Sequence, residues 1–381
     1  MTVTESNISS SPNAFKPIYT YYKSLSYEEF NTYACKPLDM VPSEISTVLD
    51  PLHPEIYQQR HIGDLTVSTY TSDELDVVFD SFIQASTSPS TRTRQERNNS
   101  QLVQITLDSV PGLRIFPAFL PQDIQQQLVV DVIEEYLPPG QHRTNLHASY
   151  TVPDPFAMFS LPPSTKLSPL PADTPPPSAP ASSSLPLSSA RSRKLRWVTL
   201  GGQYNWTTKK YPTFKLGDPG FPAFPTSLST LLSAYPPRPF SSEFDLRPIT
   251  GEASIVNFYS AGDVLSPHQD VAELSSADLV SLSLGCEAVF LASLDRQRPS
   301  LQLRVRSGDL IVMSGPARAA WHGVSKIFSG TSPEYLVGHD YSEYASTSPD
   351  CQPFIHGRHL YADWIATKRI NINIRQMLPS T

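Results

Sequence analysis

The sequence is poor in cysteine and has no long apolar run. Its three cysteines, Cys35, Cys286 and Cys351, are odd in number and far apart, which argues against a disulfide framework and against a CxxC metal site. No apolar stretch approaches the roughly 20 residues that a membrane-spanning helix needs. The first fifteen residues are polar, include Glu5 and contain no arginine, unlike a secretory signal or a mitochondrial transit peptide. We therefore expect a protein of the cytoplasm or nucleus that does not associate with membranes.

Charged residues are scarce as well, at 17%, and the formal net charge is −7. Nucleic-acid-binding proteins are often basic overall, so the net charge counts mildly against that class, although it can hide a local basic face. Hydrophobic residues make up 39% of the 381 residues, enough for the core of one large domain or two ordinary ones. The 38 prolines are about twice the average usage and indicate flexible segments. Nothing in the sequence specifies an oligomeric state.

The chain divides into segments of different composition. Residues 1–14 are polar and are predicted to be disordered. Residues 15–111 are expected to form an N-terminal extension, with short helices on the main body and a disordered loop near 84–100. The main domain is expected at 112–381, interrupted at 161–190 by nine prolines and eight serines in thirty positions. That composition buries too little apolar surface to offset the ordering entropy, so we expect a disordered insertion whose deletion leaves the domain active.

Hydrophobic periodicity predicts a β-rich domain with some helix. A helix is expected from Pro121 to about Leu137, where apolar residues recur at helical spacing. Strands are expected at 113–116, 256–259, 280–284, 301–306, 310–313 and 369–375. Several short strands joined by tight turns are typical of an antiparallel sandwich or a jelly roll, in a mostly β fold with flanking helices, of the α+β class.

A His-x-Asp pair provides the first candidate metal ligands. On an extended segment residues i and i+2 point the same way, so His268 and Asp270 present an imidazole and a carboxylate to one ion. His322 lies 52 residues after Asp270 and is a candidate third ligand. Two histidines and one carboxylate form the facial triad of non-haem iron oxygenases, which leaves positions open for a co-substrate and oxygen. An isolated His-x-Asp pair often arises by chance, so the pair alone does not establish a metal site.

The last predicted strand has one apolar and one cationic face. Isoleucines alternate along it, and the opposite face carries Arg369, Asn371, Asn373 and Arg375. Burying two arginines is costly unless anions pair with them. A dicarboxylate would satisfy both, because a guanidinium binds a carboxylate through two hydrogen bonds. A solvent-exposed edge strand with a polar outer face explains the same pattern equally well.

Residues 256–259 repeat this design upstream. Asn257 and Tyr259 point one way, and Val256 and Phe258 point the other. An amide and a phenol beside the two arginines would complete a cradle for a carboxylate. Ordinary hydrogen bonding within a sheet accounts for them as well.

Several longer segments place these motifs in a fixed order: LRWVTLG and YNW, then NFYSAGDVLSPHQD, VSLSLGCEAVFL, SGDLIVMSGPARAAWHGV and KRININIRQM. Together they resemble the AlkB-type dioxygenases, which use Fe(II), 2-oxoglutarate and O2, and most of all the eukaryotic subgroup that acts on tRNA and other nucleic acids. The resemblance covers about residues 112–381, apart from the insertion and an irregular stretch at 329–361. It is specific, because HxD, His and R-x-N-x3-R occur in order. It implies a double-stranded β-helix, or jelly-roll, core.

The resemblance implies roles for the residues that match the family's motifs. The iron ligands would be His268, Asp270 and His322. The residues implied to bind 2-oxoglutarate are Asn257, Tyr259, Ser281, Arg369, Asn371 and Arg375. Within that set, Arg369 would pair with the distal carboxylate, and Arg375 would hold the carboxylate next to the keto group.

The residues implied to contact the substrate are less distinctive. Trp206 lies on the segment that covers the substrate base in relatives, and the cations Lys209 and Lys210 follow it. An aromatic ring beside cations suits base stacking and phosphate contact, but a solvated charge run next to a loop is an equally good account. Bacterial relatives carry an acidic residue two positions after the Asp ligand. Here Ala272 stands at that position, followed by Glu273, so their base preference is not carried over.

The sequence therefore predicts an Fe(II)- and 2-oxoglutarate-dependent dioxygenase that demethylates N-methylated bases, in RNA more than in DNA. The alternatives are a protein or small-molecule hydroxylase with the same cofactors, and a non-catalytic nucleic-acid-binding protein on this fold. The first usually has a basic residue much closer to the second His ligand, whereas the two arginines follow His322 by 47 and 53 positions. The second has no reason to keep a complete metal triad.

Overall fold

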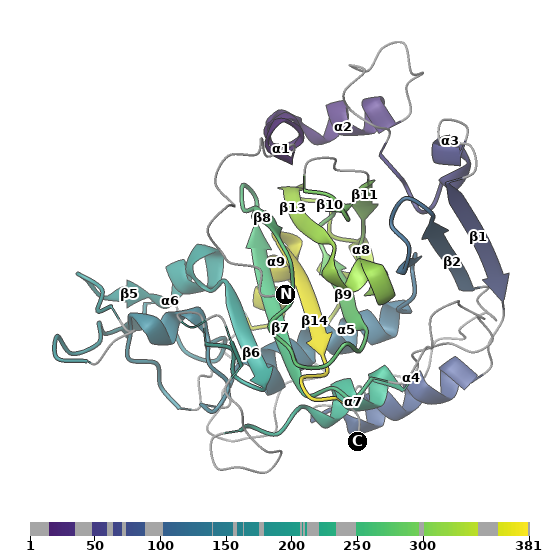
Figure 1. The fold of residues 1–381 in the computed structure, drawn as a ribbon. Coiled ribbons are helices and arrows are strands. Elements are labelled where there is room, and N and C mark those ends of the chain that lie inside the picture. Colours follow the sequence, from purple (N-terminus) through teal and green to yellow (C-terminus); the bar gives the residue numbers. More distant parts are fainter. Residues whose placement is uncertain are drawn as a thin grey trace.

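The computed structural model of the chain consists mainly of β-strands with helices around them (Figure 1). It describes residues 15–34, 48–58, 64–70, 74–87, 102–138, 140–154, 158–162, 164–174, 179–205, 208, 210–211, 221–233, 249–296, 301–341 and 357–379. The predicted disordered segment 1–14 and most of the predicted loop near 84–100 lie outside the described residues. No helix within the described ranges has both the length and the apolar character needed to cross a membrane.

Eight antiparallel strands form the larger sheet, in the order β1-β2-β3-β12-β9-β14-β7-β6. In that order they span Leu65–Tyr70, Leu102–Leu107, Leu113–Phe116, Leu310–Met313, Leu279–Gly285, Lys368–Arg375, Ala253–Ser260 and Trp197–Gly201. The strand with alternating isoleucines, β14, lies inside this sheet between β9 and β7. It is not an edge strand, and nearly all of its residues on both faces are buried. The structure thus excludes the exposed edge strand as the account of its arginines.

Four antiparallel strands form the smaller sheet, in the order β11-β10-β13-β8. They span Leu301–Val305, Ala288–Ser293, Trp321–Ile327 and Leu265–His268. Between the two sheets lies a buried apolar layer, with Ile311 and Met313 from the larger sheet against Phe290 and Leu303 from the smaller one. Two antiparallel sheets around one apolar layer make a jelly roll. The predicted mostly β fold with a jelly-roll core and flanking helices is confirmed.

Helices cover the outer face of the larger sheet (Figure 1). They are α4 (Glu74–Ala85), α5 (Gln122–Asp131), α7 (Thr226–Leu232), α8 (Glu334–Val337) and α9 (Gly357–Ala366). A π-helical turn at Val132–Tyr136 continues α5, so the helix predicted between Pro121 and about Leu137 is confirmed. Its Ile124 and Leu128 share one core cluster with the isoleucines of β14.

The N-terminal helices α1 (Phe15–Ser24) and α2 (Tyr27–Ala34) cover the smaller sheet (Figure 1). Phe15, Ile18 and Tyr22 pack in one cluster with Val289 and Leu291 of β10. Spacing of i, i+3 and i+7 puts these three side chains on one face of α1. The helix is thus held against the sheet that carries part of the candidate site. A short helix, α3 (Pro54–Gln58), precedes β1.

The Pro/Ser-rich insertion packs onto the domain, which corrects the prediction of disorder over 161–190. Its described parts comprise a strand pair, β4 (Lys166–Leu167) with β5 (Leu185–Pro186), and a helical turn, α6 (Leu187–Ser189). Leu167, Leu185 and Leu187 are buried in the same cluster as α9. The segment packs in spite of its composition because a few leucines anchor it, and its prolines reduce the conformational entropy that folding must overcome.

Truncating one of these anchors is expected to destabilise the protein. Leu187 is fully buried, so Leu187→Ala is expected to lower the free energy of unfolding by about 2–5 kcal/mol through lost contacts and the cavity left behind. Urea denaturation measures this. The matched control is Leu52→Ala, whose side chain is 52% exposed and whose loss is expected to change the free energy by less than about 0.5 kcal/mol. Equal effects of the two substitutions would contradict the packing of the insertion.

Candidate active site

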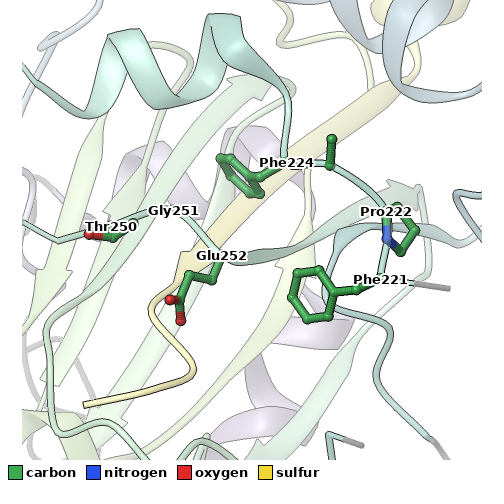
Figure 2. A pocket seen from close by; sticks show the side chains of 7 residues that line it. Phe221, Pro222, Phe224, Thr250, Gly251 and Glu252 are labelled. Carbon is green, nitrogen blue, oxygen red and sulfur yellow. The ribbon is translucent and has the colours of Figure 1, made fainter. Parts of the chain in front are cut away.

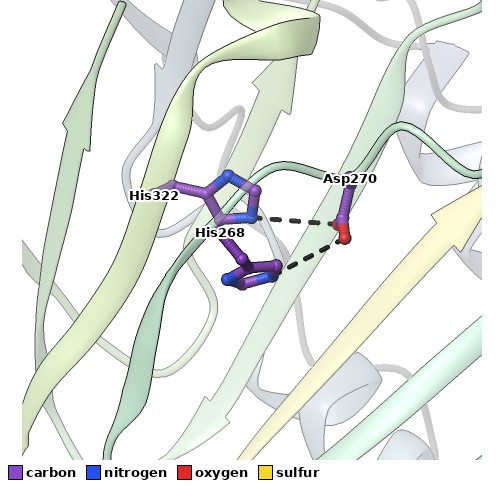
Figure 3. Close-up of side chains that lie close together, drawn as sticks. All are labelled: His268, Asp270 and His322. Carbon is purple, nitrogen blue, oxygen red and sulfur yellow. Dashed lines mark ion pairs between the residues drawn. The ribbon is translucent and has the colours of Figure 1, made fainter. Parts of the chain in front are cut away.

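Two neighbouring strands bring the predicted metal ligands together. β8 ends at His268, and β13 places His322 directly opposite it. Nε2 of His268 lies 3.6 Å from Oδ1 of Asp270, and Nε2 of His322 lies 3.8 Å from Oδ2. One ligand atom from each residue lies within 4.8 Å of the other two (Figure 3). The three predicted ligands therefore converge on one point, in an arrangement that could hold a metal ion.

Backbone carbonyls orient both imidazole rings. Nδ1 of His268 is 2.9 Å from the Ser266 carbonyl oxygen, and Nδ1 of His322 is 3.0 Å from that of Ala320. With Nδ1 donating to a carbonyl, the lone pair of each neutral ring lies on Nε2, toward Asp270. Burial lowers the pKa of His322 to about 4, which keeps this ring neutral at physiological pH. Both features suit metal ligands.

The Asp270 carboxylate is largely shielded from solvent, with a side chain 11% exposed, and is held in its charged form. Burial by itself raises its pKa, but the Arg375 guanidinium, together with the two histidines, holds the pKa well below its usual range. Oδ2 accepts hydrogen bonds from Nη2 of Arg375 at 2.7 Å and from Nδ2 of Asn373 at 3.1 Å. These donors come from β14, so the larger sheet positions the carboxylate while the smaller sheet positions the two histidines.

A buried arginine with open donors lies on the same strand. Arg369 is 2% exposed, and its Nη2 donates to Oγ of Ser283 at 3.2 Å. Among the described residues, no acceptor lies within hydrogen-bond distance of its Nε or Nη1. Tyr259 of β7 stands opposite Arg369, and its buried hydroxyl also has no hydrogen-bond partner among the described residues. Buried donors left unpaired are costly. Two guanidinium donors and a phenol facing the same space fit one carboxylate of a dicarboxylic acid.

Polar residues line the sheet between Arg369 and Arg375. Asn371 donates from Nδ2 to Oγ of Ser281 at 2.7 Å, across from β14 to β9. Asn257 stands opposite Asn371 on β7 and is half-buried. The residues that the resemblance assigns to 2-oxoglutarate thus share one face of three adjacent strands.

Arg375 differs from Arg369 because it is already paired. Besides Asp270, it donates through Nη1 to the Tyr211 hydroxyl at 3.0 Å, and this nitrogen is 3.4 Å from Oε1 of Glu273. A carboxylate of the co-substrate would therefore share Arg375 with a metal ligand. No local pattern points to Tyr211, because its partner Arg375 lies 164 residues away.

An arginine outside the predicted set braces the loop that carries Asp270. Arg318 lies in a short 3-10 turn, Gly315–Ala319, just before β13. It donates to the carbonyl oxygens of Asp270 and Ala277 and pairs with the Glu273 carboxylate at 2.7 Å. Glu273, the acidic residue noted beside the family's acidic position, is therefore buried in an ion pair. No local pattern points to Arg318, because its partners lie 41 to 48 positions away in the sequence.

Of the three predicted substrate contacts, the structure describes only Lys210. Trp206 and Lys209 lie outside the described residues. Lys210 is exposed and bridges to Asn205. These three residues stay predictions.

A separate hollow of about 440 Å³ lies where the chain enters β7 (Figure 2). It is lined by Phe221, Pro222, Ala223, Phe224, Thr250, Gly251 and Glu252. The Glu252 carboxylate accepts the backbone N–H of Met377 at 2.6 Å and of Leu378 at 2.9 Å, which ties the chain after β14 to this place. None of the predicted site residues lines the hollow, so the active site is assigned to the triad.

The site combines two histidines and an aspartate at one point with a buried arginine whose open donors fit a carboxylate. This combination defines the class of non-haem metal oxygenases with an organic-acid co-substrate. Residues 112–375 match the sequence profile of the 2OG-Fe(II) oxygenase superfamily, and the chain belongs to that superfamily. It is therefore a 2-oxoglutarate-dependent dioxygenase, and its family implies Fe(II), 2-oxoglutarate and O2.

Similarity to characterised proteins extends over most of the chain. The N6-methyladenosine RNA demethylase ALKB1 of Pyricularia oryzae is 34% identical over 297 residues, which cover 70% of this chain and 75% of that protein. The tRNA demethylase abh1 of Schizosaccharomyces pombe is 31% identical over 292 residues, covering 72% and 82%. The DNA N(6)-methyladenine demethylase ALKBH1A of Arabidopsis thaliana is 36% identical over 189 residues, covering 49% of each chain. The predicted resemblance to AlkB-type dioxygenases is confirmed.

Proposed function

We propose that this enzyme oxidatively removes methyl groups from N-methylated bases of nucleic acid, with RNA as the preferred substrate. The observation that carries the chemistry is the triad of His268, Asp270 and His322 beside the open donors of Arg369. Support for the substrate class comes from the similar proteins, whose names specify methylated RNA, tRNA or DNA.

In this proposal His268, Asp270 and His322 hold Fe(II), and Arg369 with Tyr259 takes the distal carboxylate of 2-oxoglutarate. Together, Fe(II), 2-oxoglutarate and O2 supply the oxidising power that hydroxylates a substrate C–H bond while 2-oxoglutarate becomes succinate and CO2. A hydroxymethyl group left on a base nitrogen loses formaldehyde, which gives the demethylated base.

The protein contributes orientation, charge and exclusion of water. The buried Arg369 fixes one end of the co-substrate, and Asn371 with Ser281 lines the wall between the two arginines. Arg375 keeps Asp270 ionised and in place. Preorganised groups in a dry pocket need not rearrange during the reaction, and this is how such sites lower a barrier.

The preference for RNA rests on charge and on how each nucleic acid is recognised. The net charge of −7 disfavours a strong, sequence-independent grip on duplex DNA, which depends on neutralising phosphates. A folded RNA with an exposed base relies more on shape and stacking. Trp206, Lys209 and Lys210 are the proposed contacts for such a base and its phosphates. The similar RNA and tRNA demethylases also match a larger share of this chain than the plant DNA demethylase does.

Formaldehyde release is expected to depend strongly on the form of the substrate. A methylated RNA stem-loop is expected to react at least about ten times faster than methylated duplex DNA of equal length, because flipping a base out of a duplex costs a few kcal/mol. Methylated single-stranded DNA serves as the intermediate case, and unmethylated RNA as the blank. Turnover confined to duplex DNA, or to a methylated peptide, would defeat the substrate proposal and leave the metal site untouched.

A further inference from the structure

Helix α1 reaches a strand of the metal site, although it lies outside the residues that match the superfamily profile. The Tyr19 hydroxyl donates to the Val324 carbonyl oxygen at 2.5 Å. Val324 follows His322 by two residues on β13, and it is paired with Leu265 of β8, the strand that ends at His268. One phenol of the N-terminal helix therefore contacts the strand pair that carries both histidines.

The contact falls on an irregularity in that strand pair. The pairing of β13 with β8 shifts register between His322 and Val324. The two strands approach closely there, because a Cβ added at Gly323 would lie 2.6 Å from the Leu265 carbonyl oxygen. A β-bulge takes backbone groups out of the regular ladder, so groups next to it need partners from elsewhere. The Tyr19 hydroxyl is such a partner for β13.

The contact of Tyr19 also adjoins the carboxylate cradle. Val324, whose carbonyl accepts the Tyr19 hydrogen bond, packs in one buried cluster with Tyr259, and Leu265 of β8 packs against the same cluster. Tyr259 is the phenol that faces Arg369 across β7 and β14, and among the described residues its hydroxyl has no hydrogen-bond partner. The hydrogen bond from α1 therefore holds a residue that packs with the phenol of the cradle.

Covering the smaller sheet does not require this hydroxyl. Other contacts of the same helix do so: Tyr22 hydrogen-bonds Gln302 of β11, and Nζ of Lys326 donates to the Lys23 carbonyl at 2.9 Å. Phe15 and Ile18 add apolar contacts. The docking of α1 therefore does not depend on the Tyr19 hydroxyl. What this hydroxyl adds is the hydrogen bond to Val324 beside the irregular pairing of β13 with β8.

We propose that Tyr19 is a positioning residue of the active site, whose hydroxyl fixes the irregular pairing of β13 with β8 and, through Val324, the packing behind Tyr259 of the 2-oxoglutarate cradle. The inference rests on the proposed assignment of Arg369 and Tyr259 to the distal carboxylate. It makes helix α1 part of the co-substrate site, acting through the shape of the cradle and the placement of His322.

The test is 2-oxoglutarate binding to Tyr19→Phe, measured by calorimetry with Mn(II) in place of iron, so that nothing turns over. Loss of one hydrogen bond that shapes the site is expected to raise the Kd for 2-oxoglutarate roughly three- to tenfold. The matched control is Tyr22→Phe, the same change on the same helix, which removes the hydrogen bond to Gln302. This control is expected to leave the Kd within about twofold, while both variants lose similar thermal stability.

Two results would overturn the inference. One is a Tyr19→Phe protein with the wild-type Kd for 2-oxoglutarate. The other is an equal loss of affinity in Tyr22→Phe, because the effect would then belong to the docking of α1 in general. Arg369→Met in the same assay separates this inference from the proposed function. If Arg369→Met still binds 2-oxoglutarate normally, the cradle itself is wrongly assigned; if it does not, a normal Tyr19→Phe refutes the role of Tyr19 alone.

Discussion

Arg369→Met is expected to abolish 2-oxoglutarate binding and, at the same time, to stabilise the protein in the absence of the co-substrate. The loss in binding is expected to be about 3–5 kcal/mol, more than a hundredfold in Kd, because a buried carboxylate would lose its counter-ion. The gain in stability is expected to be about 1–3 kcal/mol, because the substitution removes a buried cation whose Nε and Nη1 have no acceptor among the described residues. Opposite signs in the two measurements are what distinguish a ligand site from a structural arginine.

The control is a buried arginine whose charge is already satisfied. Arg304 is 8% exposed and pairs with Glu287 at 2.7 Å. Arg304→Met is expected to lower the free energy of unfolding by about 3–5 kcal/mol, because the buried Glu287 carboxylate loses its nearest cation and keeps only Arg306, 3.8 Å away, and to leave the Kd for 2-oxoglutarate unchanged. Calorimetry gives the Kd, and urea denaturation gives the stability. An Arg369→Met protein that is less stable than wild type and still binds 2-oxoglutarate would show that Arg369 is structural.

Asp270→Asn is expected to remove turnover and to weaken metal binding by more than about a hundredfold. Substitution of outer partners of metal ligands alone costs about ten- to a hundredfold in metal affinity, and Asp270 is the charged ligand itself. The amide keeps the shape of the side chain and still offers an oxygen to Arg375, so the fold is expected to survive. Metal affinity is measured by calorimetry with Mn(II), and turnover by succinate release.

Asp131→Asn is the matched control for this substitution. Asp131 is also buried, in α5, and it accepts hydrogen bonds from Gln127 and Ser86, but it lies in the helix-covered core away from the triad. Burial raises its pKa to about 7, so replacing it by the neutral amide is a mild change. Asp131→Asn is expected to keep normal metal affinity. If Asp270→Asn then also released succinate at the normal rate, the triad would be wrongly assigned.

Local alternation was enough to predict the strands of the carboxylate cradle, at 256–259, 280–284 and 369–375, but it did not predict β8 and β13, which carry the two histidines. His268 and Asp270 share a face because they are two residues apart, and the face of β14 follows from its regular spacing of isoleucines. The sequence could not decide whether β14 is a buried strand that binds an anion or an exposed edge strand, because this depends on which strands pair with it. The structure places β7 and β9 on its two sides, and this burial turns its arginines into a candidate binding site.

Contacts between distant segments could not be predicted from any local pattern. The brace from Arg318 to Glu273 joins residues 45 positions apart, and the hydrogen bond from Tyr19 to Val324 spans 305 positions. The insertion at 161–190 was misjudged for the same reason, since its leucines gain burial only from segments remote in sequence. The metal ligands could be predicted in spite of their long spacing, because two histidines and one carboxylate are a distinctive set of ligands.

The central claim is that one site couples the consumption of 2-oxoglutarate to demethylation of a base. The most direct measurement quantifies succinate and formaldehyde together in single reactions with an N-methylated RNA stem-loop, Fe(II) and 2-oxoglutarate. The account predicts equal amounts of the two products in the wild-type enzyme and neither product in Asp270→Asn or Arg369→Met. Formaldehyde that still forms without 2-oxoglutarate, or in Asp270→Asn, would contradict it.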